Sequence, residues 1–264
     1  MVREEVYRVA RSPRFWAATA LGLMLLIPGA LQYNEGPKDV PGMNPNLYNV
    51  YEAFMWAEKA WLILFVPVLA ALPFADSYAL DRVSGYLRAV LMRASYRRYL
   101  LTKLGTNLLA GGLVLVLPLI LFFLVSHFLF AADLPSIQEA RMRPTGPASS
   151  LYWDHPTLFI GFLIGVAFAF GAVYATLGMA ISFWATNRYV VLATPFVLYH
   201  AANFILGVAG LARWTPPMTF FPEGVNNSTW LTIFGELGFI FVVSLIGIAL
   251  KANKELATLD KESE

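Results

Sequence analysis

The chain of 264 residues contains no cysteine. This absence excludes a disulfide framework and any site that uses a thiolate as a nucleophile or metal ligand, and it leaves the redox compartment open. The chain also has only three histidines, which are too scattered to form a metal cluster local in sequence. Charged residues are scarce, at 14%, and a net charge of +2 gives no indication of nucleic-acid binding.

Hydrophobic residues make up 58% of the chain, which is more apolar surface than a soluble domain of this length can bury. A bilayer-spanning helix needs about 20 mostly apolar residues. The sequence therefore predicts an all-α integral membrane protein, a single transmembrane domain over 1–264 with six spans, at 13–33, 53–75, 100–132, 157–186, 189–212 and 230–250. An interfacial segment over 1–12 is expected to precede the spans and a cytoplasmic tail over 251–264 to follow them.

Lysine and arginine concentrate in every second connection between the spans. With a cytoplasmic N-terminus, 14 of the 19 basic residues fall on the cytoplasmic side and five outside, at positions 38, 59, 141, 143 and 213. Cytoplasmic segments of membrane proteins carry such an excess. We therefore expect a multi-pass protein of the cell membrane with both termini in the cytoplasm.

The N-terminal segment MVREEVYRVARSP is predicted to form an amphipathic helix lying on the membrane surface, with Val2, Val6 and Val9 on one face. Glu4 and Arg8 are spaced for an i,i+4 ion pair, and Ser12-Pro13 is a typical start for the first span. A frayed basic tail that serves only topology is the alternative. A cleaved signal peptide is disfavoured, because acidic residues precede the first span and no small-residue cleavage site follows it.

The stretch DRVSGYLRAVLMRASYRRYLLTKL, at 81–104, connects the second and third spans. Ser84 is expected to cap a helix that starts at Gly85, and Ser95 to cap the climb into the third span. The predicted helix is about 15 Å long and lies parallel to the membrane. Its apolar stripe needs a cover, which is either lipid or a partner protein; the members of the stripe are Tyr86, Leu87, Val90, Leu91 and Ala94.

The wider stretch FADSYALDRVSGYLRAVLMRASYRRYLLTKL resembles the inner loop of ABC type-2 transporter permeases, the membrane subunits of ATP-binding cassette transporters. The resemblance is carried by an acidic residue, a Gly-centred turn, a short Leu-rich helix, an Arg-flanked break and a Lys at the start of the next span, which correspond to Asp76, Asp81, Gly85, Leu87, Leu91, Arg97 and Lys103. The family's commoner Thr after the Gly and Pro before the Arg are absent, which indicates a divergent branch. The layout of six spans with both ends inside is similar too.

The resemblance implies that the segment from Gly85 to Arg93 is a coupling helix, which docks on a separate ATP-binding subunit. The partner-binding residues it implies are Asp81, Gly85, Leu87, Arg88, Leu91, Arg93 and Arg97. The chain has no GxxxxGK[ST] loop and no Gly-Lys pair, so ATP and Mg²⁺ are expected on the partner and no cofactor on this chain. Two ATPase copies and a second permease chain, identical or homologous, complete the expected assembly. The alternative is that the arginines serve only topology and anionic headgroups.

Polar residues within the spans are expensive in hydrocarbon, and each is expected to face a neighbour or a cavity. His200, Asn203 and Glu236 are candidates for lining a substrate path, with interhelical hydrogen bonding as the alternative. Two rows of small residues in the fourth span, spaced four apart, predict close helix packing, within one bundle or between subunits; they are Gly161, Gly165 and Ala169, and Ala167, Gly171 and Ala175.

The function predicted is that of a permease subunit that moves, and by resemblance exports, a hydrophobic or amphipathic substrate such as a drug, peptide or lipid. An intramembrane enzyme would need motifs such as HExxH or Gly-x-Ser-x-Gly, which the sequence lacks, so no enzymatic activity is expected of this chain. An ion-coupled secondary transporter would show inverted repeats and more buried carboxylates than Glu236. A membrane anchor subunit would share the partner without transport.

Overall fold

The structure is a computed structural model that describes residues 2–34, 49–131, 134, 140, 143–224 and 228–263, with side chains through Glu255. Over these ranges the chain is helical, and the only extended pairing is an isolated bridge between Asn49 and Ala131. Six helices are long and apolar enough to cross a membrane, which confirms the predicted number. Residues 35–48, 132–133, 135–139, 141–142 and 225–227, which include Lys38 and Arg141, lie outside the described residues, as does the side chain of Lys261.

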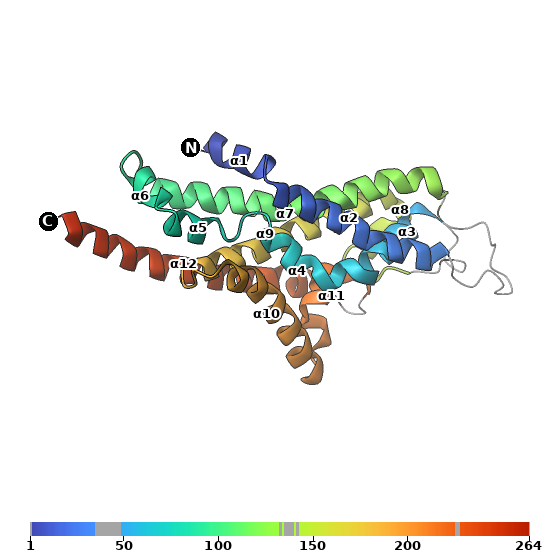
Figure 1. Cartoon of the computed structure of the whole chain (residues 1–264). Helices are drawn as coiled ribbons and strands as arrows, with labels where there is room; N and C mark the ends of the chain where they lie inside the picture. Colours follow the sequence, from blue (N-terminus) through green and yellow to red (C-terminus); the bar gives the residue numbers. More distant parts are fainter. Residues whose placement is uncertain are drawn as a thin grey trace.

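Of the six long helical segments, all except α10 run roughly along one axis (Figure 1). The six segments are α2 (Pro13–Asn34), the continuous series α3 (Val50–Ala57), η1 (Glu58–Leu62) and α4 (Ile63–Ala71), α7 (Tyr96–Leu129), α9 (Pro156–Ser182), α10 (Arg188–Val208) and α12 (Trp230–Ser263). The shorter elements are α1 (Val2–Ala10), α5 (Ser77–Val83), α6 (Tyr86–Leu91), α8 (Ser149–Asp154), η2 (Ala212–Trp214), α11 (Pro216–Phe220) and η3 (Pro222–Gly224).

The helix bounds differ from the predicted spans at several places, for example Val50–Ala71 instead of 53–75 and Arg188–Val208 instead of 189–212. Two further differences have local reasons. The third span begins at Tyr96 instead of 100, because Ser95 is extended and the helix starts directly after it. The sixth span continues without a break to Ser263, where a separate tail was predicted from 251. The residues beyond 250 are mostly Ala, Lys, Glu and Leu, which are strong helix formers and give the helix no reason to stop.

The centre of the bundle is the contact between α7 and α9. A Cβ atom built on Gly111 of α7 would lie 2.6 Å from the Gly171 carbonyl oxygen of α9, so only glycine allows this approach. The row containing Gly171 therefore packs within the bundle. The other predicted row does not serve this purpose, because a Cβ on Gly161 or Gly165 meets no atom within 4 Å.

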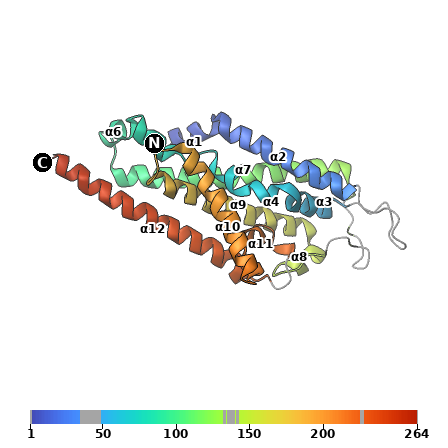
Figure 2. The same cartoon turned by 60° about the horizontal axis from the view of Figure 1, so that its bottom comes forward.

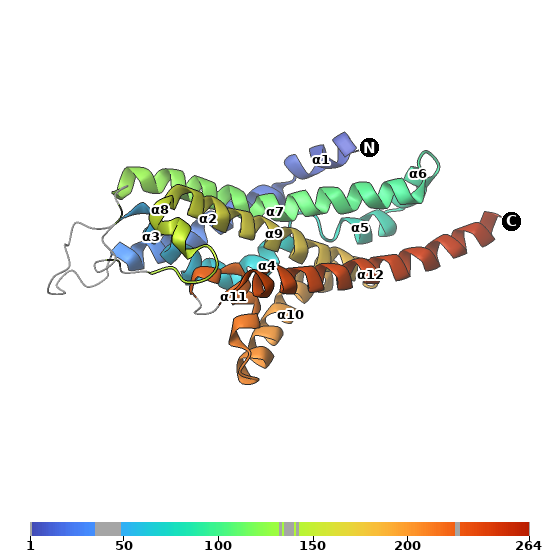
Figure 3. The same ribbon diagram turned by 180° about the vertical axis from the view of Figure 1, so that it is seen from behind.

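Helix α10 diverges from the bundle, and the chain returns through η2 and α11 (Figures 1 and 3). Only 17% of the most apolar window of α10 is buried, compared with 61% in α9, so α10 is peripheral. Segment α11 instead lies inside the protein: Pro216, Pro217, Thr219 and Phe220 are buried, and the helix packs on α12, α10, α9 and α4. Pro216 and Pro217 thus start a short buried helix that is shielded by protein.

Both termini lie at one end of the bundle together with α5 and α6, and we call this the terminal end (Figures 1 and 2). Helices α3 and α8 lie at the opposite end, which we call the far end (Figure 1). Of the described basic residues, the sequence assigned Lys59, Arg143 and Arg213 to the side opposite the termini and the others to the side of the termini.

Candidate functional site

The loop 76–103 folds into two short helices joined by a left-handed turn. Gly85 has φ +76°, a conformation that costs a residue with a Cβ atom about 1–2 kcal/mol. Ser84 ends α5 and donates its hydroxyl to the Asp81 carbonyl at 3.4 Å, so its predicted role as the cap of the next helix was wrong. Ser95, predicted as the second cap, precedes α7 but makes no side-chain cap bond. Helix α6 has six residues, about 9 Å instead of the predicted 15 Å.

The inward side of α6 packs on the protein itself. Leu87, Val90 and Leu91 are half-buried against the apolar cluster that α5, α7, α9 and α12 form, whose members are Tyr78, Tyr96, Tyr99, Met179, Ala180, Phe183, Ile248 and Ala252. The sequence analysis expected either lipid or a partner protein to cover this stripe. In the structure, the chain's own bundle partly covers Leu87 and Leu91.

The outward side of α6 remains exposed. Val83 at the end of α5, Tyr86 in α6 and Met92 directly after α6 are 68%, 44% and 81% exposed, and we call these three side chains the outer face of α6. Arg88, Arg93 and Arg97 of the same loop are exposed as well. Exposed apolar residues together with exposed arginines are a typical feature of a protein–protein contact.

A buried ionic cluster joins α1, α5 and α7 beneath this surface. Lys103 is fully buried, and its Nζ lies 2.6 Å from Asp81 Oδ2 and 3.0 Å from Glu5 Oε2. Arg8 bonds to Asp81 at 3.2 Å and to Glu5 at 3.3 Å, and the Tyr99 hydroxyl donates to Asp81 at 2.8 Å. We call these five residues the anchoring cluster. It fixes the N-terminal helix and the loop to the start of the third span.

Two further contacts hold the same loop. Arg14, at the start of the first span, bonds to Asp76 at 2.8 Å. Tyr78 stacks on Phe183 with ring centroids 3.7 Å apart, and its hydroxyl donates to Glu255 of α12. Burial raises the pKa of Tyr78, and its hydrogen bonds to Glu255 and Tyr96 raise it further, so the phenol stays protonated and donates.

Tyr96 and Arg82 bond to the same Glu255 carboxylate, at 3.0 and 3.2 Å. The loop is therefore tied to the first, third, fourth and sixth spans, through Arg14, Lys103, Phe183 and Glu255.

Sequence reasoning found Asp81 and Lys103 through the resemblance but missed Glu5, Tyr99 and Glu255. The predicted surface pair was Glu4–Arg8, whereas Arg8 reaches Glu5 and Asp81. The sequence did contain one signal for this contact. Lys103 lies in an apolar helix, where a lysine needs an acidic partner, and Glu5 is an acidic residue on the amphipathic N-terminal helix. Which acid it would meet depends on the tertiary packing of α1 on α7.

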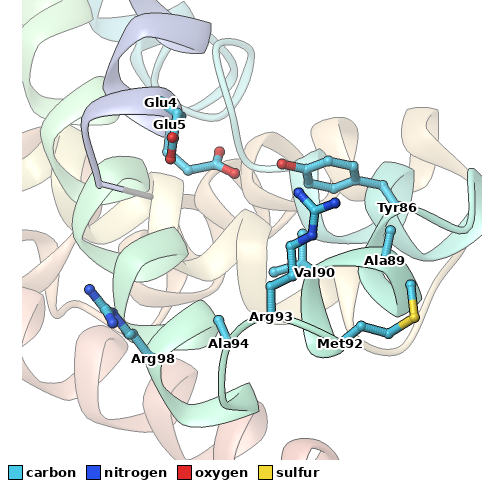
Figure 4. Close-up of a pocket in the computed structure, with 9 residues that line it drawn as sticks. All are labelled: Glu4, Glu5, Tyr86, Ala89, Val90, Met92, Arg93, Ala94 and Arg98. Atoms are coloured by element: carbon cyan, nitrogen blue, oxygen red, sulfur yellow. The ribbon is translucent and has the colours of Figure 1, made fainter.

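A groove of about 460 Å³ separates α1 from α6 (Figure 4). Glu4 and Glu5 line one wall, and Tyr86 and Met92 line the other. Arg93 turns toward Tyr86 between these walls, and Arg98 lies apart on α7 (Figure 4). The groove therefore places acidic residues (Glu4 and Glu5) and a basic residue (Arg93) beside the outer face of α6.

The three candidates for a substrate path do not meet one another. His200 bonds through Nε2 to the Leu64 carbonyl of α4 at 3.1 Å, and the Thr219 hydroxyl of α11 donates to Glu236. Asn203 is half-buried on α10. In the part of the chain that the structure describes, no hydrogen bond or ion pair links any two of the three. The bonds of His200 and Glu236 are of the interhelical kind that the alternative reading expected.

Comparisons with protein-family models, curated proteins and solved structures found no match to this chain.

Proposed function

We propose that the chain is the permease subunit of an ATP-binding cassette transporter, driven by a separate ATPase subunit that docks on α6. Two observations at one end of a six-span bundle carry the proposal. The short helix α6 has an exposed apolar outer face, and the anchoring cluster fixes the adjoining helix α5 through Asp81. Neither lipid anchoring nor topology requires a helix fixed in this way, because basic residues on a flexible loop satisfy both.

The proposed docking surface differs in detail from the one the resemblance implies. Gly85, Arg88, Arg93 and Arg97 keep their place in it because they are exposed. Leu87, Leu91 and buried Asp81 act behind the surface, by seating α6 on the bundle and joining the anchoring cluster. In this proposal Val83, Tyr86 and Met92 make the direct apolar contacts with the ATPase subunit.

The anchoring contacts suggest how motion would pass to the membrane. The coupling pathway we propose runs from α6 to Asp81 and from there to Lys103 at the base of α7 and Glu5 of α1. A second branch runs from Tyr78 to Phe183 and Glu255. ATP and Mg²⁺ bind the ATPase subunits in this proposal, two copies of which pair with two permease chains, identical or homologous.

Orientation and assembly are part of the proposal. The excess of basic residues at the terminal end favours a cytoplasmic location for both termini. In the permeases that the loop resembles, the contact between the two chains involves mainly the first and fifth spans. The exposed apolar residues of α10, among them Val197, Phe204 and Ile205, fit such a contact with the second permease chain. The scarcity of charge within the spans favours a hydrophobic or amphipathic substrate, which the transporter exports from the cell.

The direct test is co-purification of the full-length chain, tagged and expressed in its native membranes. We expect a polypeptide with a GxxxxGK[ST] loop to co-purify and to hydrolyse ATP. The double variant Tyr86→Asp, Met92→Asp places charges in the contact, and a desolvated unpaired charge costs several kcal/mol, so recovery of the ATPase falls at least about tenfold.

Tyr7→Asp is the matched control, because Tyr7 is a similarly exposed tyrosine (53%) on the neighbouring helix α1. It keeps the ATPase in this account. Absence of any Walker-motif partner, or equal recovery with the double variant and the wild type, contradicts the proposal.

One observation favours an ion-coupled secondary transporter as a second candidate. Glu52, Glu58 and Glu223 are buried at or near the far end, beyond the single carboxylate that the sequence suggested. Transport by the purified chain in vesicles that contain a proton or sodium gradient but no ATP would favour this candidate. ATP-dependent transport that survives collapse of both gradients would favour the permease.

A further inference from the structure

Two hollows lie along the contact of α1 with α7, apart from the anchoring cluster and the outer face of α6. The first, which we call the polar hollow, has about 400 Å³ and lies between α1 and the first two turns of α7. The second, the apolar hollow, has about 220 Å³ and lies further along the same two helices, beside the start of α2. The polar hollow is lined by Val2, Ser95, Arg97, Arg98, Leu101 and Thr102.

The polar hollow is basic. Arg97 and Arg98 are exposed, and Arg98 extends away from Tyr86 and Arg93 (Figure 4). Within the described residues, neither Arg97 nor Arg98 forms an ion pair, and no acidic residue lines the polar hollow. The guanidinium group of an unpaired arginine offers a planar fork of donors that matches the oxygens of a phosphate group.

The same hollow contains a buried hydroxyl group without a partner. Thr102 is 8% exposed, and among the described residues none forms a hydrogen bond with its hydroxyl. The hydroxyls of Thr19, Thr176 and Thr194 show the usual arrangement, since each donates to the carbonyl four residues earlier. Buried polar atoms are almost always hydrogen-bonded, so the Thr102 hydroxyl and the two arginines together indicate a ligand that accepts hydrogen bonds.

The apolar hollow has a different lining. It contains no charged residue, and Val6, Trp16, Leu109 and Leu113 contribute to its walls. These four side chains are 44%, 55%, 49% and 40% exposed, so the hollow is open to its surroundings. Because the hollow lies beside the first and third spans, these surroundings are the acyl chains of the bilayer.

The two hollows succeed each other on one face of α7. Positions 98, 102, 106, 109 and 113 line them and recur three or four residues apart, which places them on one side of the helix. Arg98 and Leu113 are 15 residues apart, which is about 22 Å along the axis of α7. One bilayer leaflet with its headgroup region is about 20–22 Å thick. A basic end followed by an apolar groove over this length matches the shape of one phospholipid molecule.

We propose that the contact of α1 with α7 is a binding site for one anionic phospholipid of the leaflet at the terminal end. Its phosphate group binds Arg97, Arg98 and the Thr102 hydroxyl, and one acyl chain lies along Leu109 and Leu113. The bound lipid covers the exposed apolar side of α1 and holds this helix on α7. The site does not depend on the ATPase subunit. Arg97 also belongs to the proposed docking surface, so Arg98 and Thr102, which do not, are chosen for the test.

The test is native mass spectrometry of the purified full-length chain in detergent, with phosphatidylglycerol or phosphatidylcholine added at equal concentrations. We expect one phosphatidylglycerol per chain, bound at least about tenfold more tightly than phosphatidylcholine, because basic side chains favour anionic lipids. The double variant Arg98→Gln, Thr102→Val loses hydrogen bonds to the phosphate, which lowers the affinity for phosphatidylglycerol about tenfold.

Arg188→Gln is the matched control and keeps the wild-type affinity, because Arg188 is an exposed arginine at the start of another span, α10. Equal binding of the two lipids by the wild-type chain overturns the proposal. An affinity for phosphatidylglycerol that is unchanged in the double variant overturns it as well.

A second variant tests the acyl-chain part of the site. Ala10 is exposed and lines the apolar hollow, so Ala10→Phe fills the space of several methylene groups. The affinity for phosphatidylglycerol is expected to fall at least about tenfold, since each buried methylene group contributes to lipid binding. An unchanged affinity in Ala10→Phe contradicts the position proposed for the acyl chain.

Competition on the wild-type chain separates a lipid from a free phosphate compound and does not depend on the folding of any variant. Glycerol phosphate has the phosphate group without acyl chains. We expect a hundredfold molar excess of it to leave phosphatidylglycerol bound. Displacement of the lipid by an equal concentration of glycerol phosphate identifies a site for soluble phosphate compounds and overturns the lipid proposal.

Discussion

At the scale of single residues, the anchoring cluster is the most demanding feature of the chain. Lys103 is fully buried with two carboxylates, Asp81 and Glu5, and it lies 4.7 Å from the centroid of the Phe74 ring. A buried ion pair adds little stability compared with an apolar replacement of the whole group, but loss of one partner leaves an uncompensated charge. The cluster therefore fixes geometry, and single substitutions within it are costly.

Replacement of Lys103 by Met removes the cation and keeps most of the volume. We expect the free energy of unfolding to fall by about 3–5 kcal/mol, because Asp81 and Glu5 are left buried with one fewer cation. Thermal unfolding in detergent measures the change. Lys254→Met is the control, because Lys254 is exposed, and it shifts stability by less than about 0.5 kcal/mol. Equal shifts in the two variants contradict the role of the cluster.

At the scale of elements, the turn at Gly85 decides how α6 is presented. A Cβ atom at this position would meet no atom within 4 Å, so there is space for a side chain. The constraint on residue 85 is therefore its positive φ. The neighbouring prediction of a serine cap failed because Ser84 keeps the right-handed helical backbone of α5 and ends that helix, while the left-handed Gly85 precedes α6. The preference for Gly in a left-handed turn, by contrast, is a property of the residue alone and could be predicted.

Gly85→Ala is expected to lower the free energy of unfolding by about 1–2 kcal/mol through backbone strain. Gly85→Asn loses less, because asparagine tolerates the left-handed region better than other residues with a side chain. Unfolding of both variants in detergent measures the order. If alanine and asparagine have equal effects, the turn is not the constraint.

The contact of α7 with α9 gives a second prediction for elements. Gly111→Ala pushes a methyl group against the Gly171 backbone, and overpacking of this kind costs about 1–3 kcal/mol. Gly165→Ala is the control on α9, where a Cβ atom meets no neighbour. The yield of folded chain after solubilisation separates the two, and a loss with Gly165→Ala alone would show that the helix pairing is different.

At the scale of the whole molecule, most of the architecture could be predicted because a bilayer imposes length and apolarity on each span. The number of spans and the position of the basic loop followed from this constraint. The divergence of α10 and the burial of α11 could not be predicted. They depend on contacts between residues far apart in the sequence, and no local pattern encodes them.

The absence of cysteine makes the orientation easy to test, because one introduced thiol is unique. Ser84→Cys at the terminal end and Ser150→Cys on α8 at the far end both replace exposed serines. In intact cells we expect a membrane-impermeant maleimide to label only Ser150→Cys, and a permeant one to label both. The reverse pattern with the impermeant reagent would place the termini outside.

The central claim is that the outer face of α6 contacts an ATPase subunit, and cross-linking from Met92 tests it most directly. Met92, directly after α6 at the terminal end, is 81% exposed. Phe128, near the C-terminal end of α7, is 89% exposed and serves as the control. With a thiol-anchored photo-cross-linker in native membranes, Met92→Cys is predicted to capture a polypeptide that carries a GxxxxGK[ST] loop, and Phe128→Cys is predicted not to capture it. Capture of lipid alone by Met92→Cys, with no such polypeptide, would contradict the account.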